Sequence, residues 1–175
     1  MKEIEGIEVR KLAPEYIEGF KQLIESLKNE KVKMGLENVD VDKWIASSLK
    51  FQALYNFGFF LAIDLSKNKV VVFSNILRNI TKEKKYNIQN FFEIGIGVEK
   101  EYRRKGIGTM LLKHVLENAK NLKIEKVFVD IHKDNLASIA FSKRMGLRRC
   151  MKKIVNLFII KIFCNKNLSL NGKRK

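Results

Sequence analysis

The residues best suited to chemistry lie where an apolar segment runs into a basic loop that contains two glycines. The segment is Glu93-Ile-Gly-Ile-Gly-Val98, and after four further residues the loop reads Arg103-Arg-Lys-Gly106-Ile-Gly108. Glycines lack a Cβ, so a ligand can approach the backbone closely. The free N–H groups and the dipole of a following helix favour an anion there. With three basic residues beside the glycines, this loop predicts a site for a pyrophosphate.

The loop does not match the two common phosphate-binding motifs. The Walker A pattern G-x-x-x-x-G-K-[ST] is missing, and so is the G-x-G-x-x-G spacing of dinucleotide-binding proteins. No group of Cys and His has the spacing of metal ligands, and no Ser/His/Asp arrangement matches a nucleophile motif. We therefore expect a pyrophosphate site without a metal.

Two blocks of the sequence resemble one enzyme family. Arg103-x-x-Gly106-x-Gly108 resembles the acyl-CoA-binding signature [QR]-x-x-G-x-[GA] of GNAT N-acetyltransferases. Further along, Asn135-Leu-Ala-Ser-Ile-Ala-Phe-Ser-Lys-Arg-Met-Gly146-Leu147 resembles the family's N-x-x-A/S-I-x-L/F-Y-x-K-x-G-F block. The two blocks stand in the family's order, with one helix and one strand expected between them. The resemblance covers residues 91–147, and the first ninety residues match the family only in their order of elements.

The resemblance implies an α/β fold of the α+β type. It predicts a mixed, mostly antiparallel sheet of about six or seven strands with about four flanking helices. The strands before the two blocks would splay apart, and the pantetheine arm of acetyl-CoA (or coenzyme A), the co-substrate, would lie between them. The residues that the resemblance assigns to this co-substrate are Ile96, Gly97, Val98, Arg103, Arg104, Lys105, Gly106, Ile107, Gly108, Thr109, Asn135, Phe141, Ser142 and Lys143.

Amide formation from a thioester requires a neutral amine, a donor for the developing oxyanion and a proton for the departing thiolate. In the family a backbone N–H near Val98 supplies the oxyanion contact. The tyrosine that often protonates the thiolate falls at Ser142, which is a departure from the family pattern. Ser142 either hydrogen-bonds to the sulfur or only lines the pocket. A thiol pKa of about 8.5 already makes the thiolate a fair leaving group.

Glu93 and Asp130 are the candidates for a general base. Glu93 shares a strand face with Gly95 and Gly97. Asp130 lies in mid-strand, where a carboxylate is rarely buried unless it has a partner or a function. Each could deprotonate an amine through water or form an ordinary salt bridge. His132, at the end of the same strand, is a third candidate or a capped residue. The two glycines either leave room for the pantetheine arm or mark a bulge or close packing.

The elements that must position these residues follow from hydrophobic periodicity and turn signals. We expect the order β-α-α-β-β-β-α-β-α-β-β, with a loop at Thr81 to Asn90 and a hairpin that turns near Asn156. That hairpin would place Cys150 opposite Cys164, although a reducing cytosol disfavours a disulfide. The expected strands are 7–12, 59–64, 70–80, 91–98, 126–132 and the 148–163 hairpin, and the expected helices are 14–27, 40–58, 108–121 and 135–145.

Charge and composition restrict the class of protein. The 175 residues carry a formal charge of +16, and residues 135–175 hold eleven Lys and Arg with no acid. This balance favours an anionic partner such as nucleic acid or a phosphorylated ligand. No apolar run approaches the roughly 20 residues of a membrane helix. We expect a cytoplasmic protein with one domain over residues 1–164, a basic, flexible tail over 165–175, and no membrane partner.

Three functions remain open. The first is transfer of an acetyl group from acetyl-CoA to a primary amine by direct attack in a ternary complex. The second is a non-catalytic acyl-CoA-binding or regulatory module, and the third is a basic protein associated with nucleic acid or the ribosome. The expected partners are an amine acceptor (a protein N-terminus, a lysine or a small amine), a second copy in a homodimer, and an anionic partner held weakly by the basic C-terminus.

Overall fold

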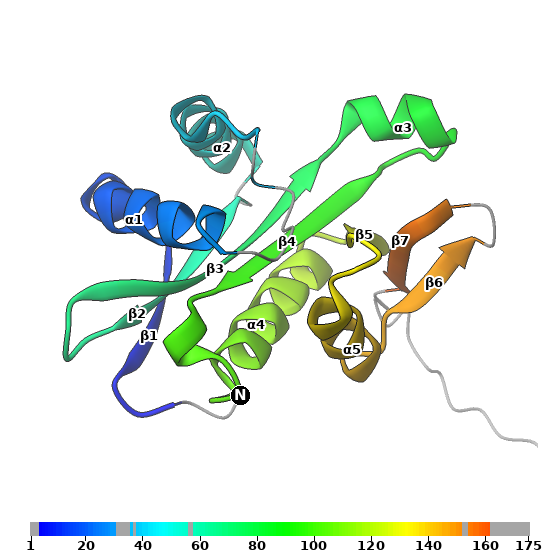
Figure 1. Ribbon diagram of the computed structural model, residues 1–175. Coiled ribbons are helices and arrows are strands. Elements are labelled where there is room, and N and C mark those ends of the chain that lie inside the picture. The colour runs from blue at the N-terminus through cyan, green and yellow to red at the C-terminus, as the bar shows by residue number, and fades with distance from the viewer. Residues whose placement is uncertain (1–3, 31–35, 37, 56–57, 152–153, 162–175) are drawn as a thin grey trace, which may run out of the picture.

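The computed structural model describes residues 4–30, 36, 38–55, 58–151 and 154–161 (Figure 1). Within these ranges the chain forms seven strands, five α-helices and two short 3-10 helices. In chain order they are β1 (Ile7–Lys11), η1 (Pro14–Tyr16), α1 (Ile17–Lys28), α2 (Val41–Tyr55), β2 (Phe59–Asp64), β3 (Lys69–Arg78), α3 (Ile80–Tyr86), β4 (Phe92–Val98), η2 (Lys100–Tyr102), α4 (Ile107–Asn121), β5 (Lys126–Asp130), α5 (Leu136–Arg144), β6 (Arg148–Met151) and β7 (Ile154–Lys161).

The strands form one sheet in the order β1-β2-β3-β4-β5-β7-β6. Only β4 and β5 pair in parallel, and the other neighbours are antiparallel. The mixed, mostly antiparallel sheet expected from the sequence is therefore confirmed. The chain has one helix more than expected, α3, which lies between β3 and β4 (Figure 1).

Helices cover both faces of the sheet, and each face has its own core (Figure 1). On one face, α1 buries Phe20, Leu23, Ile24 and Leu27 against side chains of β2 and β3. Trp44 of α2 completes an aromatic cluster there with Phe20. On the other face, the apolar stripe of α4 packs on inward-facing residues of β3, β4 and β5. Successive residues of β4 thus face α1 and α4 in turn.

The parallel strands β4 and β5 separate soon after they meet. Their pairing consists of Phe92 with Val127 and Glu93 with Phe128. In contrast, β4 pairs with β3 over its whole length, and β5 pairs with β7 over its own. The splayed pair predicted from the sequence is confirmed, and the gap opens toward Val98 on one side and Asp130 on the other.

Two expectations about local structure are wrong. Residues 80–86 form α3 instead of a loop, because the Asn79 side chain accepts the Lys82 N–H at the helix start and Asn87 takes the left-handed conformation at its end. The terminal hairpin turns before Asn156, since Met151 already pairs with Ile154. Arg149 pairs with Phe158, so the turn that would place Cys150 opposite Cys164 is not formed, and that expectation is wrong as well. Cys164 itself and the 165–175 tail lie outside the described residues, so the basic tail stays a prediction.

The helices in the described part of the chain are all too short or too polar to cross a bilayer.

Candidate functional site

The edge of β4 that faces the gap carries free hydrogen-bonding groups. Beyond the strand's ends, the Glu99 N–H donates to Val71 O and the Asn79 N–H donates to Phe91 O, so odd-numbered residues of this segment direct their amides to β3. Even-numbered residues direct theirs to β5, because backbone groups alternate along a strand. After Glu93, no described strand pairs with that edge. The N–H groups of Ile96 and Val98 therefore face the gap.

The loop after β4 presents the start of α4 without a capping side chain. Arg104 and Gly106 both have left-handed backbone conformations, with φ of 62° and 84°. Gly106 is the N-cap residue, and the first turn of α4 contains no acid. The N–H groups of that turn are thus open to an anion, as the sequence predicts for a pyrophosphate. Gly108 lies against β4, because an added Cβ would stand 3.0 Å from Val98 Cγ2.

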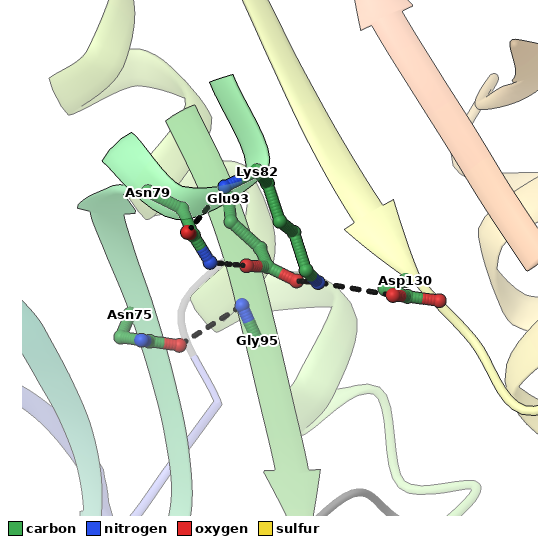
Figure 2. Close-up of polar contacts among 6 residues, drawn as sticks. All are labelled: Asn75, Asn79, Lys82, Glu93, Gly95 and Asp130. Carbon is green, nitrogen blue, oxygen red and sulfur yellow. Dashed lines mark hydrogen bonds and ion pairs between the residues drawn. The ribbon is translucent and has the colours of Figure 1, made fainter. Parts of the chain in front are cut away.

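The strand glycines of β4 are explained by packing on the face of α1. A Cβ on Gly95 would lie 2.5 Å from Asn75 Oδ1, which accepts the Gly95 N–H (Figure 2). A Cβ on Gly97 would lie 2.4 Å from Phe73 and 2.6 Å from Leu27. Of the two readings left open by the sequence, close packing accounts for both positions. The free edge of the strand comes from the missing strand partner rather than from the glycines.

The three basic residues of the loop differ in their contacts. The Arg103 guanidinium donates to Val98 O at 2.9 Å and pairs with Glu30 at 2.5 Å, so it ties the end of β4 to the segment that follows α1. Arg104 is exposed. Lys105 Nζ lies 5.2 Å from the centre of the Tyr102 ring, within cation–π range. Arg104 and Lys105 remain placed to meet a phosphate, whereas the charge of Arg103 is shared with a carboxylate.

Tyr102 anchors this loop to the β2–β3 turn. Its buried hydroxyl donates to Asp64 Oδ2 at 2.7 Å, and the other oxygen of Asp64 accepts from Ser66. The hydroxyl of Ser66 and that of Tyr102 lower the pKa of Asp64, whereas burial and Asp64 raise the pKa of Tyr102. The loop thus rests on a polar contact between groups that are distant in sequence.

The second block forms the start and inner face of α5. Asn135 Oδ1 accepts the Ser138 N–H at 3.0 Å and so caps the helix. Phe141 packs against the core cluster that includes the stripe of α4. Ser142 is buried, with 4% of its surface exposed, and Lys143 is exposed. The predicted pocket-lining residue Ser142 is thus inward-facing, and Lys143 lies on the surface.

The two candidate bases meet at one lysine (Figure 2). Lys82 Nζ lies 2.5 Å from Glu93 Oε1 and 3.0 Å from Asp130 Oδ2. The Asn79 amide donates to the other Glu93 oxygen at 2.8 Å. Burial lowers the pKa of Lys82, but its bonds to Glu93 and Asp130 outweigh this effect, so the pKa is raised and the side chain is a cation at neutral pH. Lys82, Glu93 and Asp130 are called the bridged cluster below.

The bridged cluster lies at the point where the strands separate. Glu93 is the last residue of β4 that pairs with β5, and Asp130 follows the paired residue Phe128 by two positions. Both side chains are on the face of Gly95 and Gly97, opposite α4, because side chains alternate along strands. The structure therefore brings the two carboxylates together beside the gap.

The remaining titratable candidate is accounted for locally. His132 Nδ1 accepts the Asp134 N–H at 3.3 Å in the turn before α5, which is the capped alternative of the two left open. In the described part of the chain, no group of three or more His, Cys, Asp or Glu could hold a metal ion.

Sequence reasoning missed Lys82, Asn79 and Asn75. Their segment was expected as strand and loop, and its polar residues match no motif. The one available signal was the pair of asparagines at 79 and 87, which suit the start and the end of a short helix.

Comparisons with known proteins agree with this geometry. Residues 77–147 match the model of the acetyltransferase (GNAT) family. The matched segment contains both sequence blocks and the whole splayed pair, so the resemblance to this family expected from the sequence is confirmed over residues 77–147. No curated protein matches the chain.

Solved structures of GNAT enzymes share the fold over nearly the whole chain. A GNAT-family acetyltransferase from Staphylococcus aureus is 18% identical, with a TM-score of 0.69 over 90% of this chain and 99% of that one. The ribosomal-protein-alanine N-acetyltransferase from Brucella melitensis is 18% identical, with a TM-score of 0.68 over 87% and 96%. A phosphinothricin acetyltransferase from Sinorhizobium meliloti, in complex with acetyl-CoA, is 15% identical, with a TM-score of 0.67 over 90% and 89%.

Proposed function

We propose that the protein is an acetyl-CoA-dependent N-acetyltransferase that acts on a primary amine by direct attack in a ternary complex. The observation that carries the proposal is the free edge of β4, which leads directly to the uncapped start of α4. A co-substrate with a pyrophosphate at one end and an amide-bearing arm at the other matches these two features in order. The GNAT family match supports the same assignment.

The co-substrate site consists mainly of backbone groups. The N–H groups at the start of α4 and the side chains of Arg104 and Lys105 would hold the pyrophosphate. The N–H groups of Ile96 and Val98 would bond to the pantetheine arm, and the one nearest the thioester would stabilise the developing oxyanion. Acetyl-CoA supplies an activated acyl group and a thiolate leaving group. These donors are fixed in place by the fold, so little reorganisation is required during the reaction.

The acceptor would approach from the face of the sheet opposite α4, where Glu93 and Asp130 flank the gap. An amine that attacks the thioester must lose two protons over the reaction, one to become neutral and one after the C–N bond forms. Glu93 is the better placed of the two to accept a proton, because the Asn79 amide fixes its carboxylate (2.8 Å) at the last paired position of β4. The thiolate leaves as the C–S bond breaks and takes a proton from solvent or from Ser142.

A non-catalytic acyl-CoA-binding module is the second candidate, and Ser142 is the observation that favours it. The family's tyrosine at this position is replaced by a buried serine, whose hydroxyl is a much weaker acid than a phenol. Such a module would bind acetyl-CoA with the same residues and would release no thiol. The third function, association with nucleic acid, would depend on the basic C-terminus, of which residues 162–175 lie outside the described residues.

Turnover of acetyl-CoA separates the first two functions. The purified protein is incubated with acetyl-CoA and a panel of a peptide N-terminus, a lysine-containing peptide, a small alkylamine and an arylamine, and free thiol is measured. Amine-dependent thiol release supports the enzyme. Tight binding of acetyl-CoA by calorimetry, without thiol release above the amine-free rate, would contradict it and support the binding module. Binding to nucleic acid that stays unchanged as the salt concentration rises would count against the third function, because contacts to phosphates weaken with salt.

A further inference from the structure

Lys82 occupies the place that an acceptor amine would need. Its ammonium bonds to Glu93 and to Asp130, so a primary alkylammonium already bridges the two groups available to receive an acceptor's proton (Figure 2). The side chain comes from α3, which belongs to neither sequence block. An acceptor that enters the gap on this face therefore meets carboxylates that are already paired with a cation.

We propose that Lys82 is an internal substitute for the acceptor, and that the acceptor is a primary alkylammonium of the type –CH2–NH3+, which binds by displacing Lys82 from Glu93. The inference rests on the function proposed above and names the class of substrate for that same site.

The charges of the bridged cluster favour this exchange. With Lys82 in place, one ammonium stands against two carboxylates, so the cluster carries a net negative charge that attracts a further cation despite the +16 charge of the chain. When Lys82 turns to solvent, the two carboxylates are left beside each other, and their repulsion is relieved by another cation or by the uptake of a proton. A neutral acceptor cannot supply that charge, and an acceptor with a carboxylate next to its amine would be repelled.

Lys82 can leave while the rest of the site stays in place. Its side chain is 22% exposed, and the ammonium is carried by a flexible stem of four methylene groups, so it has a path to water. Glu93 keeps its bond to Asn79, whose own side chain caps α3. The far end of α3 is held by Tyr86, which packs on the stacked rings of Phe91 and Phe128. The exchange thus requires rotation of one side chain and no movement of the helix.

A displaceable internal ammonium weakens the apparent affinity for the acceptor. Only the fraction of molecules in which Lys82 has left Glu93 can bind, and the apparent dissociation constant rises by the inverse of that fraction. Removal of the ammonium should therefore improve binding of a charged acceptor, which is the opposite of the effect expected if Lys82 only supported the fold.

The first test measures binding without any need for activity. Lys82→Ala deletes three methylene groups and the ammonium, a fragment equivalent to n-propylammonium. Millimolar n-propylammonium chloride should raise the melting temperature of Lys82→Ala by a few degrees, by mass action. It should not do so in the wild type or in Lys84→Ala, a matched control for an exposed lysine on α3. Sodium chloride and n-propanol are the ligand controls. A rise no larger than with n-propanol would overturn the proposal.

The second test uses Lys82→Met, which keeps an apolar stem of similar length and removes the charge. The KM for an alkylamine acceptor should fall by about tenfold, whereas the KM for an arylamine, which is neutral at pH 7, should stay unchanged. An equal change for both acceptors, or a higher KM for the alkylamine, would overturn the proposal. If the wild type transfers no acetyl group to any amine, the proposed function fails, and the melting-temperature test still decides whether the carboxylates bind a free alkylammonium.

Discussion

The two halves of the candidate site are built from different materials. The co-substrate half, from Ile96 through Gly108, consists mostly of backbone N–H groups at a strand edge and a helix start. The acceptor half consists of side chains from three separate elements, with Lys82 on α3, Glu93 on β4 and Asp130 on β5. A backbone site tolerates many sequences as long as the fold is kept, whereas a side-chain site changes with a single substitution. In the proposed function, the first half would therefore define the class of reaction, and the second half would select the acceptor.

The largest effect should come from Gly106→Glu in the backbone half. A carboxylate at the uncapped start of α4 would repel the pyrophosphate, and we expect acetyl-CoA to bind about 100-fold or more weakly. The φ of 84° also adds backbone strain of roughly 1–2 kcal/mol for any side chain. Gly146→Glu is the matched control, because Gly146 has the same φ and an added Cβ meets nothing within 4 Å. Calorimetry that shows equal affinity in folded Gly106→Glu would refute the assignment of this loop.

Substitution in the side-chain half should affect catalysis more than co-substrate binding. Glu93→Gln should lower kcat/KM by about 100-fold, the lower end of the range for general acid–base catalysis, and leave the affinity for acetyl-CoA unchanged. Asp130→Asn should have a smaller effect, because Asn79 contacts Glu93 and not Asp130. If both variants keep the wild-type kcat/KM between pH 6 and pH 9, neither carboxylate is the base, and the enzyme relies on amine that is already neutral in solution.

A smaller effect is expected at Tyr102, whose bond to Asp64 anchors the loop of the backbone half to the β2–β3 turn. Tyr102→Phe removes the 2.7 Å bond to Asp64, and we expect the melting temperature to fall by roughly 2–4 °C. The pKa of Asp64 is lowered in the folded state, so its contribution to stability is present above its unfolded pKa and is lost as the pH falls through the folded pKa. The difference between Tyr102→Phe and the wild type should therefore shrink in acid. A constant difference from pH 7 down to pH 2 would contradict this account.

The smallest effect is expected at Ser142. If this buried hydroxyl only lines the pocket, Ser142→Ala should change the KM for acetyl-CoA slightly and leave kcat within about threefold of the wild type. Steady-state kinetics with a fixed alkylamine measures both constants. A fall in kcat beyond about tenfold, with an unchanged circular dichroism spectrum, would show that the serine donates to the sulfur in the transition state.

The contrast between the halves also explains what could be predicted from the sequence. The loop and its helix were predictable because glycine spacing and adjacent basic residues are local signals for an anion site. The bridged cluster was not, because Lys82 is 48 positions from Asp130, and only the paired strands and α3 bring the two side chains within 3.0 Å. The glycines of β4 were visible in the sequence, but the packing of Gly97 depends on Phe73 and Leu27, and that of Gly95 on Asn75, all of them remote in the chain.

The secondary structure followed the same division. Strands with continuous apolar runs, such as Phe59–Asp64, and the amphipathic helix Ile107–Asn121 agree closely with the expected ranges. The polar helix α3 was missed because none of its residues is buried, so its sequence has no apolar stripe that would indicate a helix. The position of the last turn was missed because Asn156 suggested a turn, whereas this asparagine lies inside β7, from Ile154 to Lys161.

The splay between β4 and β5 has a mechanical consequence. Among the described strands, only two residue pairs of the backbone ladder join a block of four strands, β1 to β4, to a block of three, β5 to β7. A molecule bound along the free edge of β4 and against β5 would supply contacts between the two blocks where the strand pairing is missing. Co-substrate should then do more than react. By occupying the gap between β4 and β5, bound co-substrate should slow amide hydrogen exchange in the strands on both sides. It should also couple the local unfolding of one block to that of the other.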